Sequence, residues 1–303
     1  MGEWKLIRLN FGRNPVHFGE LGIGIEETSE RVRSDSLFSA WVSAYARLFG
    51  KEAVEEMLGN FINQTEPPFR LSSTLIYRQV EGKTIYYLPR PLQRPTNYPK
   101  DDFDFAKEYK KLNYLPLEVW QRWYQGEGWQ ETDKAELRAR VKKLKIESQA
   151  LENSGTFGYS EAFEKEKLPK IAVDRTTRAT NIYQTGFVKY SSKKNGNDIK
   201  ILAGLYFLVY FSEPDLLNGF LTVLNFLGEE GLGGERSGGA GQFQVDEKLE
   251  LTPEWKNLID FTDGNYHSLI SLFWQPQLSI DYLEEASYEL HSRGGWTAGS
   301  PTG

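Results

Sequence analysis

Apolar and polar residues in the first fifty positions predict a strand followed by a helix. Residues Trp4–Phe11 alternate between apolar and polar side chains, which is the pattern of a β-strand. Residues Arg33–Phe49 then place apolar side chains at helical spacing, at positions 37, 41, 45 and 48. Ser34 or Asp35 can cap the start of this helix, and Gly50 can end it.

Two strand-like stretches follow, and the second half of the chain repeats the scheme. Residues Phe69–Tyr77 and Thr84–Leu88, joined through Glu81-Gly82, predict a β-hairpin. Beyond residue 198 the patterns predict a buried strand, a helix and two later strands, at Ile199–Phe211, Pro214–Leu227, Tyr266–Trp274 and Ser287–Ser292. Strand, helix and later strands, twice in this order, predict an α+β fold with two tandem ferredoxin-like (RRM-like) βαββαβ domains.

A polar and basic stretch separates the two predicted units. Residues Gly155–Asn197 lack helical periodicity and are interpreted as an inserted hairpin or arm, and the helix predicted before them, Asp133–Leu151, is rich in Lys and Arg. We therefore divide the chain into residues 1–198, with a helical insertion and the arm at about 155–197, and residues 199–303.

A glycine-rich loop, GLGGERSGGAG at Gly231–Gly241, lies between the second predicted helix and the short strand-like stretch Gln242–Val245. Six glycines in one loop predict a main-chain surface with exposed amides, against which a phosphodiester chain can lie. The loop follows a helix and lacks Gly-Lys-Ser/Thr, so it is not a Walker A loop, and Arg236 stands where a dinucleotide fingerprint needs its third glycine. The alternative is a surface linker.

Composition limits the classes of protein that remain. The chain of 303 residues has no cysteine, which excludes disulfides, thiolate metal sites and cysteine nucleophiles. Its first residues lack the apolar core of a signal peptide, and its longest apolar run, Ile201–Phe211, is too short for a membrane span, so we expect a cytoplasmic protein. The 8 Trp, 16 Tyr and 18 Phe argue against disorder.

The net charge of −6 hides an uneven distribution. Residues Phe69–Lys100 hold six Lys/Arg and one acid, and Asp174–Lys200 hold six Lys/Arg and two acids. Residues Glu229–Glu289 hold thirteen acids and three Lys/Arg. Such asymmetry suits a subunit that contacts a polyanion through its basic segments and a protein elsewhere, although ordinary solvated faces would give the same pattern.

Three stretches of the chain carry a family resemblance. NPVHFGELGIGIEETSERVRSDSLFSAWVSAYARLFG, at Asn14–Gly50, resembles the N-terminal signature of RAMP-superfamily subunits of type III-A CRISPR (Csm) interference complexes, specifically the fourth-numbered Csm subunit. IAVDRTTRATNIYQT, at Ile171–Thr185, is similar to the arm of that family, and Gly231–Phe243 is similar to its glycine-rich loop. The chain ends in GGWTAGSPTG, where the family usually adds a strand, so the last domain is expected to be incomplete or closed differently.

The resemblance implies two RRM-like domains, no catalytic activity and no cofactor. It implies a subunit that grips the 5′ repeat-derived tag of crRNA, beside the large polymerase-like subunit and a neighbouring RAMP backbone subunit, with no membrane contact. Two alternatives stay open: a metal-independent RAMP endoribonuclease that processes crRNA, and the equivalent subunit of a type III-B complex.

His17 and Asp35 are the residues on which a catalytic alternative depends. His17 would contact RNA or, in the nuclease alternative, transfer a proton; His267 and His291 are remote in sequence. A related backbone subunit cleaves RNA with an aspartate and a metal, but Asp35 is interpreted as a helix cap, since nothing brings other carboxylates to it. We therefore predict no catalytic residue and no metal site.

The predicted RNA-binding residues combine backbone amides, guanidinium groups and an aromatic ring. Arginines of the arm would hold phosphate while Tyr183 stacks on a base, and Glu235 would pair with Arg236 or accept from a base edge. We expect Gly→Val changes in the loop to block RNA while the isolated protein stays folded. The tryptophans at 120, 123 and 129 are interpreted as core or protein interface. The predicted RNA contacts are His17, Gly19, Arg33, Ser34, Arg175, Thr176, Arg178, Tyr183, Gly231, Gly233, Gly234, Glu235, Arg236, Ser237, Gly238 and Gly241.

Overall fold

One antiparallel sheet organises the chain in the computed structural model, which describes residues 2–20, 24–80, 82–95, 97–143, 157–195, 198–246, 250–264 and 267–294. Its strands are β1 Glu3–Asn10, β2 Phe69–Leu71, β3 Leu75–Val80, β4 Lys83–Pro89, β5 Tyr114–Pro116, β8 Ser192–Asn195, β9 Asp198–Phe211 and β10 Gln244–Val245, while β6 Phe163–Val173 and β7 Thr180–Tyr190 form a separate pair. The helices are α1 Ser34–Asn63, α2 Phe103–Lys111, α3 Leu117–Tyr124, α4 Glu131–Lys143, α5 Leu216–Glu230 and α6 Pro253–Ile259, with 3₁₀ turns η1 Tyr159–Glu161, η2 Arg236–Gly238 and η3 Ile280–Leu283.

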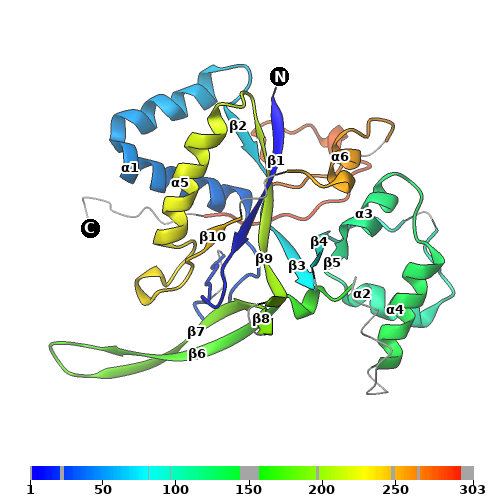
Figure 1. The fold of residues 1–303 in the computed structure, drawn as a ribbon, viewed down its shortest axis with the longest axis horizontal. Helices are drawn as coiled ribbons and strands as arrows, with labels where there is room; N and C mark the ends of the chain where they lie inside the picture. The colour runs from blue at the N-terminus through cyan, green and yellow to red at the C-terminus, as the bar shows by residue number, and fades with distance from the viewer. Residues whose placement is uncertain are drawn as a thin grey trace.

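The centre of the sheet is β9, whose apolar run is buried on both faces. Leu205 of β9 lies opposite Leu9 of β1 on one side and opposite Ile76 of β3 on the other. Helices α1 and α5 cover one face, and α3 and α6 lie on the other side of the sheet (Figure 1). Trp41 of α1 stacks on Phe220 of α5 at 5.2 Å and donates its indole N–H to the carbonyl of Phe220 at 3.2 Å. The core therefore lies between this sheet and its helices.

Six of the described elements form a ferredoxin-like unit. Strand β1, helix α1, strand β3, strand β9, helix α5 and strand β10 follow the βαββαβ order, and their strands lie in the order β10-β1-β9-β3, all antiparallel. The expectation that Ile199–Phe211 begins a second unit is not confirmed, because β9 pairs with β1 on one edge and with β3 on the other. The sheet thus continues across the predicted boundary at residues 198 and 199, and the division into two domains stays a prediction.

The two late strands predicted from the sequence are not seen. Within the described residues 267–294 there is no strand. Trp274 and Leu290, which should point into a core, are 82% and 89% exposed. A strand needs a continuous ladder of backbone hydrogen bonds, whereas the described part of this segment makes isolated ones, such as that from the amide of Ser73 to the carbonyl of Ile270 at 2.9 Å. Tyr266 lies outside the described residues, as do residues 295–303.

Helix α1 confirms the predicted helix and its end, with a correction at its start. Gly50 breaks the helical conformation with φ 84° and ψ 179°, a left-handed φ that glycine tolerates. The N-cap residue is Arg33, and no side chain caps it. Ser34 instead accepts the amide of Leu272 at 3.1 Å, and Asp35 accepts that of Ser36 and binds Arg293. The predicted cap by Ser34 or Asp35 is therefore replaced by contacts that hold the C-terminal segment.

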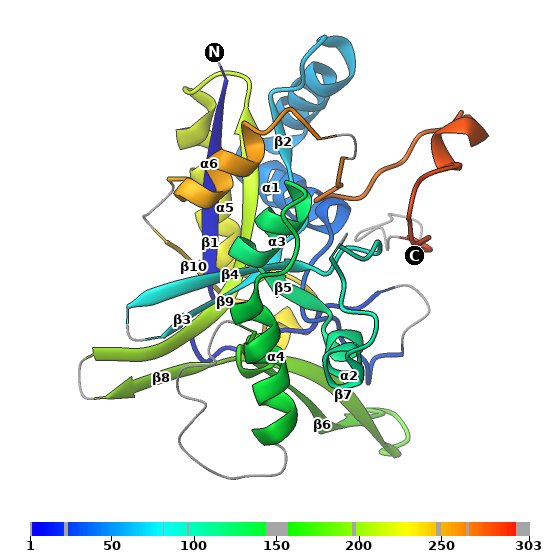
Figure 2. The ribbon, with the colours of Figure 1, turned by 90° about the vertical axis from the view of Figure 1, so that its right-hand side faces the viewer.

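The chain between β3 and β9 contains a helical insertion and the arm. The hairpin β3–β4 is confirmed, with Glu81 outside the described residues. Helices α2 to α4 pack beside β4 and β5 (Figure 2), around buried rings that include Phe105, Trp120 and Trp129, so these two tryptophans are core as predicted. Helix α4 covers the described part of the predicted helix Asp133–Leu151, and residues 144–151 lie outside the described ranges.

The predicted arm is a two-stranded hairpin of β6 and β7. Eleven residue pairs connect the strands, from Phe163 and Tyr190 at the base to Val173 and Thr180 near the tip. The hairpin extends away from the sheet and its helices (Figure 1). Its contacts with the body extend along β6 as far as Lys170, which pairs with Glu235, and residues 171–182 beyond it are exposed.

Candidate nucleic-acid interface

The glycine-rich loop, residues 231–241, packs directly on the segment that follows β1. The amide of Gly241 donates to the carbonyl of Pro15 at 2.9 Å, and the amide of Gly234 donates to that of His17 at 2.8 Å. Gly233 has φ 97°, and a Cβ there would lie 2.4 Å from the carbonyl oxygen of His17. The glycine is therefore required for close approach to the chain's own backbone. The loop is ordered by these contacts, unlike a surface linker.

Most amides of the loop are already engaged, contrary to the expectation of an exposed amide surface. The amides at 231, 232, 234, 238, 239, 240 and 241 donate to backbone carbonyls. Four amides of the loop donate to no backbone carbonyl among the described residues: those of Gly233, Glu235, Arg236 and Ser237. The side chains of Arg236 and Ser237 are at least partly exposed, and Gly238 is exposed. A phosphate would therefore meet the edge of the loop around Arg236, and buried Gly231 and Gly241 shape the loop from within.

His17 connects the loop to the arm. Its side chain is buried, with the residue 8% exposed, and its Nδ1 donates to the carbonyl of Gly186 in β7 at 2.7 Å. The ring also meets Phe187 edge-on at 6.3 Å. Because its carbonyl holds Gly234 and its ring holds β7, His17 fixes two elements relative to each other. Gly19 lies beyond it and is exposed.

Lys170, which the sequence reasoning did not select, joins the same cluster. Its ammonium pairs with the carboxylate of Glu235 and lies 5.4 Å from the ring centre of Phe187. Glu235 itself adopts a left-handed conformation, with φ 59°, uncommon outside glycine. Glu235 therefore pairs with Lys170 rather than with Arg236 as one alternative expected. We refer to residues 15–18, the glycine-rich loop, and Lys170, Gly186 and Phe187 of the arm as the loop–arm junction.

Two further lysines hold the base of the arm on its other face. Lys165 lies 2.8 Å from Glu30, and Lys167 lies 2.7 Å from Glu27. Burial tends to raise the pKa of Glu30, but hydrogen bonds from Lys165 and Tyr114 outweigh it and hold that pKa below its usual value. The hydrogen bond from Lys167 likewise lowers the pKa of Glu27. These lysines are thus neutralised within the chain.

The tip of the arm presents cations that have no such partner among the described residues. The carboxylate of Asp174 accepts the amides of Thr176 and Thr177 at 2.8 and 3.3 Å, which closes the turn and lowers the pKa of Asp174. Arg175 and Arg178 are exposed, and within the described residues neither pairs with a carboxylate. Arg178 has φ 57°, so the turn fixes its backbone in an uncommon conformation. Tyr183 lies opposite Lys170 in the hairpin, on the face of the junction.

Two predicted contacts point into the fold rather than toward a ligand. Ser34 is buried, and its backbone amide donates to Ser73 Oγ at 3.1 Å. Arg33 lies 3.4 Å from the carboxylate of Glu20. Neither residue reaches the loop–arm junction directly, although Glu20 places Arg33 beside the stretch that carries His17 and Gly19.

The basic segment 69–100 is used mainly inside the molecule. Arg78 is buried and pairs with Glu161. Arg90 lies 4.7 Å from the ring centre of Tyr109, and Arg94 lies 4.9 Å from that of Tyr98. Cation–π contacts of this kind fix the helical insertion. The segment therefore offers fewer cations to a polyanion than its composition predicts.

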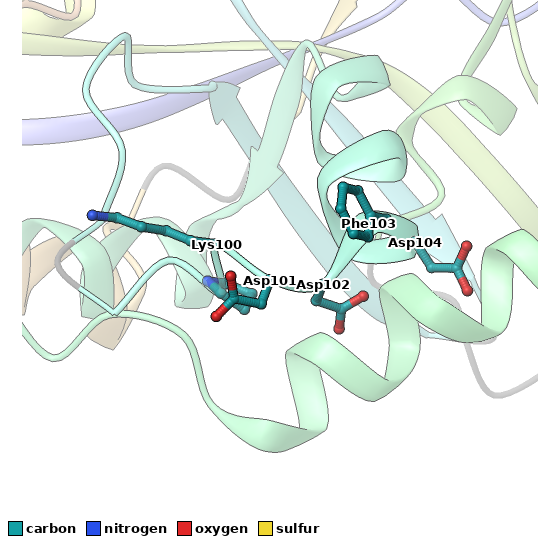
Figure 3. Close-up of a pocket in the computed structure, with 6 residues that line it drawn as sticks. Lys100, Asp101, Asp102, Phe103 and Asp104 are labelled. Atoms are coloured by element: carbon teal, nitrogen blue, oxygen red, sulfur yellow. The ribbon is translucent and has the colours of Figure 1, made fainter.

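A surface hollow lies away from the junction, in the helical insertion. It has a volume of 590 Å³ and is lined by Pro99, Lys100, Asp101, Asp102, Phe103 and Asp104 (Figure 3). Asp102 caps α2 by accepting the amide of Phe105 at 2.9 Å and also binds Arg138 at 2.6 Å. The hollow thus lies at the N-terminus of α2, where Asp102 is already engaged. Its described lining residues do not form a catalytic or ligand-binding cluster.

Two other kinds of site receive no support from the part of the chain that the structure describes. No three His, Asp or Glu side chains come together there in a way that could hold a metal ion. No helix within the same ranges has the length and apolar character to cross a membrane.

Two proteins similar to this chain carry the same name. No family model matches it. A protein of Thermococcus onnurineus named "CRISPR system Cms protein Csm4" is 27% identical over 223 residues, which cover 71% of this chain and 62% of that protein. A protein of Methanocaldococcus jannaschii with the same name is 26% identical over 277 residues, covering 84% of this chain and 68% of that protein. The match to the first thus spans less than two thirds of its length.

Solved structures include a similar chain in the "Crystal structure of Csm3-Csm4 subcomplex in the type III-A CRISPR-Cas interference complex". The identity is 20% and the TM-score 0.48, over 83% of this chain and 71% of that chain.

Proposed function

We propose that this chain is a non-catalytic crRNA-binding subunit of a type III-A Csm complex, because its similarity to proteins named Csm4 agrees with the RAMP-family resemblance of its sequence. Its ligand would be the 5′ repeat-derived tag of the crRNA. Its protein partners would be the large polymerase-like subunit and a neighbouring RAMP backbone subunit. The proposal joins the family resemblance to the geometry of the loop–arm junction.

The observation that carries the proposal is the convergence of the loop and the arm on His17. Arg236 and Ser237 stand at the open edge of the loop, and exposed Arg175 and Arg178 stand at the tip of the arm. Guanidinium groups that have no carboxylate partner within the described residues are suited to phosphate, and bidentate contacts of this kind fix orientation as well as affinity. A strand of RNA that runs from the loop to the arm tip would meet cations at both ends.

The environment of His17 supports a positioning role rather than proton transfer. A general acid or base must reach the reacting group, and this ring is buried with Nδ1 committed to Gly186. The ring also contacts Phe187. Because of these contacts, His17→Ala should loosen the loop–arm junction. If any cleavage of RNA were observed, this substitution should not abolish it.

Purification of the complex through this chain, followed by sequencing of the bound RNA, tests the proposal. We expect RNAs that share one repeat-derived 5′ end, and no cleavage of repeat RNA by the purified subunit with or without Mg²⁺. Bound RNA without a common 5′ end would contradict the tag assignment. Specific cleavage by the wild-type chain that is lost in His17→Ala would contradict the proposal and support the endoribonuclease alternative.

A further inference from the structure

The two faces of the central sheet are covered differently. The ring of Phe211 in β9 meets that of Phe220 in α5 at 5.4 Å, so Phe211 points toward α1 and α5. Successive residues of a strand point to opposite faces, so Tyr206 and Tyr210 of β9 point away from these helices. Tyr206 is buried there and meets the ring of Trp255 in α6 at 6.3 Å, whereas Tyr210 is partly exposed. This second face is therefore covered at the middle of β9 and open near its end.

Three side chains form a row across the open end of this second face. Trp4 of β1 lies opposite Tyr210 on one edge of β9, and Arg70 of β2 lies opposite Tyr210 on the other edge. Directly opposite residues share a face of the sheet. The ring centres of Trp4 and Tyr210 lie 5.4 Å apart, Trp4 is partly exposed and Arg70 is exposed. We refer to Trp4, Tyr210 and Arg70 as the open row.

The charge of the open row is available, unlike that of the arginine further along the same face. Arg8 of β1 lies opposite Tyr206, is 7% exposed and pairs with Asp246 at 2.5 Å. Arg70 pairs with no carboxylate in the part of the chain that the structure describes. Gly2 borders the hydroxyl of Tyr210 and adds no side chain over the row. The open row thus combines two aromatic rings with a guanidinium that is free to bind phosphate.

We propose that the open row binds an unpaired base of single-stranded RNA. The base stacks on the rings of Trp4 and Tyr210, and Arg70 stacks beside it or holds a neighbouring phosphate. The four-stranded sheet of an RRM stacks two or three bases on its aromatic side chains. Here the two rings lie on β1 and β9, the central strands of the order β10-β1-β9-β3. The inference goes beyond the proposed function, because it places a second RNA contact outside the loop–arm junction.

The open row and the loop–arm junction lie at opposite ends of β1. Trp4 is near the start of this strand, and the junction begins beyond its last residue, Asn10 (Figure 1). The strand from residue 4 to residue 10 rises ~3.3 Å per residue, which separates the two positions by about 20 Å. The two sites therefore bind different nucleotides, either of one RNA or of two.

The size and surroundings of the open row favour a base over a protein surface. Opposite side chains of a sheet lie about 5 Å apart, so the row spans about 10 Å. This length fits a base, whereas a standard protein interface covers about 800 Å² on each partner. Among the described residues, none of the large apolar side chains that are exposed lies on β1, β2 or β9. The strands around the row thus add no exposed apolar area for a protein partner.

Photocrosslinking tests the inference on the unmodified full chain. Short unstructured RNAs that carry 5-bromouracil are irradiated with the protein, and the crosslinked peptides are identified by mass spectrometry. One RNA has the bromouracil inside the repeat-derived tag, and a second RNA lacks the tag. We expect a crosslink to Trp4 or Tyr210 with at least one of them, and the comparison identifies which RNA supplies the base. The absence of a crosslink to β1 and β9 with both RNAs would overturn the inference.

Substitutions measure how much the open row contributes to binding. Tyr210→Leu removes the ring but keeps an apolar side chain. The matched control is Tyr45→Leu, which changes a partly exposed tyrosine of α1, on the opposite face of the sheet. We expect Tyr210→Leu to bind the crosslinking RNA at least about fivefold more weakly, and the control to bind it unchanged. Arg70→Gln should weaken binding and reduce its dependence on salt.

Equal affinities of Tyr210→Leu and Tyr45→Leu for this RNA would overturn the inference. A crosslink to the open row without any crosslink to the loop–arm junction would support the inference and count against the proposed function.

Discussion

The base and the tip of the arm both carry cations, but they use them differently. At the base, Lys165, Lys167 and Lys170 are each paired with a glutamate of the body. At the tip, Arg175 and Arg178 are exposed. Paired lysines fix the direction of the hairpin, and they have little charge left for a polyanion. Basic composition alone therefore does not locate an RNA contact, because the partners of each cation decide whether it is available.

The glycines of the loop also differ in what surrounds them, since Gly233 lies against the chain's own backbone and Gly239 is open. Substitution of Gly233 should have the largest effect on stability. Gly233→Val combines a left-handed φ with a clash against the carbonyl of His17, and should lower the free energy of unfolding by about 3 kcal/mol. Gly239 has φ 83°, and nothing lies within 4 Å of the place that a Cβ would take, so Gly239→Val isolates the strain and should cost about 1 kcal/mol. Urea unfolding of both variants measures the difference.

Equal losses in the two variants would show that the contact with His17 contributes nothing. The sequence predicted that valine in the loop would block RNA without affecting the isolated protein. At Gly233 we now expect a loss of stability as well. In the structure, the backbone that approaches Gly233 closely is the chain's own.

The pair between Lys170 and Glu235 should show a smaller, coupled effect. Lys170→Glu places two carboxylates together and should turn the arm away from the loop, weakening RNA retention by about tenfold. Glu235→Lys alone should act similarly, whereas the exchange of both charges should restore retention. A coupling free energy of about 1–2 kcal/mol in a double-mutant cycle is the expected result. Additive losses would mean that the pair does not set the position of the arm.

The order of elements could be predicted from the sequence, but their pairing could not. The strand Glu3–Asn10, the break at Gly50 and the helix Leu216–Glu230 follow from strong periodicity and a glycine at the right place. The apolar run in Asp198–Phe211 indicates a buried strand but does not indicate which strands it pairs with. Because it inserts between β1 and β3, one sheet formed where two were expected.

The candidate site shows the same limit. The glycine-rich loop, the arm and His17 were each selected, yet nothing in the sequence says that Gly234 binds the carbonyl of His17 or that Glu235 meets Lys170. Lys170 was missed because it precedes the stretch Ile171–Thr185 that carries the resemblance. Alternation along the strand could have placed Lys170 on one face with Leu168 and Ala172, but the register that puts Tyr183 opposite Lys170 comes from the structure.

The contact between Asp35 and Arg293 should give the smallest effect. Burial tends to raise the pKa of Asp35, but Arg293 and Ser36 outweigh it, so its pKa is below the usual 3.8. A carboxyl with a lowered pKa stabilises the fold above its unfolded pKa, and that contribution is lost as the pH falls below about 4. Arg293→Ala should therefore cost about 0.5 kcal/mol at pH 7 and nothing near pH 2. Thermal unfolding at both pH values checks this; an equal loss at pH 2 would contradict it.

The proposed function depends most on contact between RNA and the exposed arginines at the tip of the arm. This contact is measured by the slope of log K against log salt concentration for tag RNA, for the wild-type chain and for Arg175→Ala with Arg178→Ala. Each phosphate contact on single-stranded RNA contributes about 0.7 to that slope, so the double variant should bind more weakly with a slope smaller by about 1.4. An unchanged affinity and an unchanged slope would show that RNA does not reach the tip of the arm.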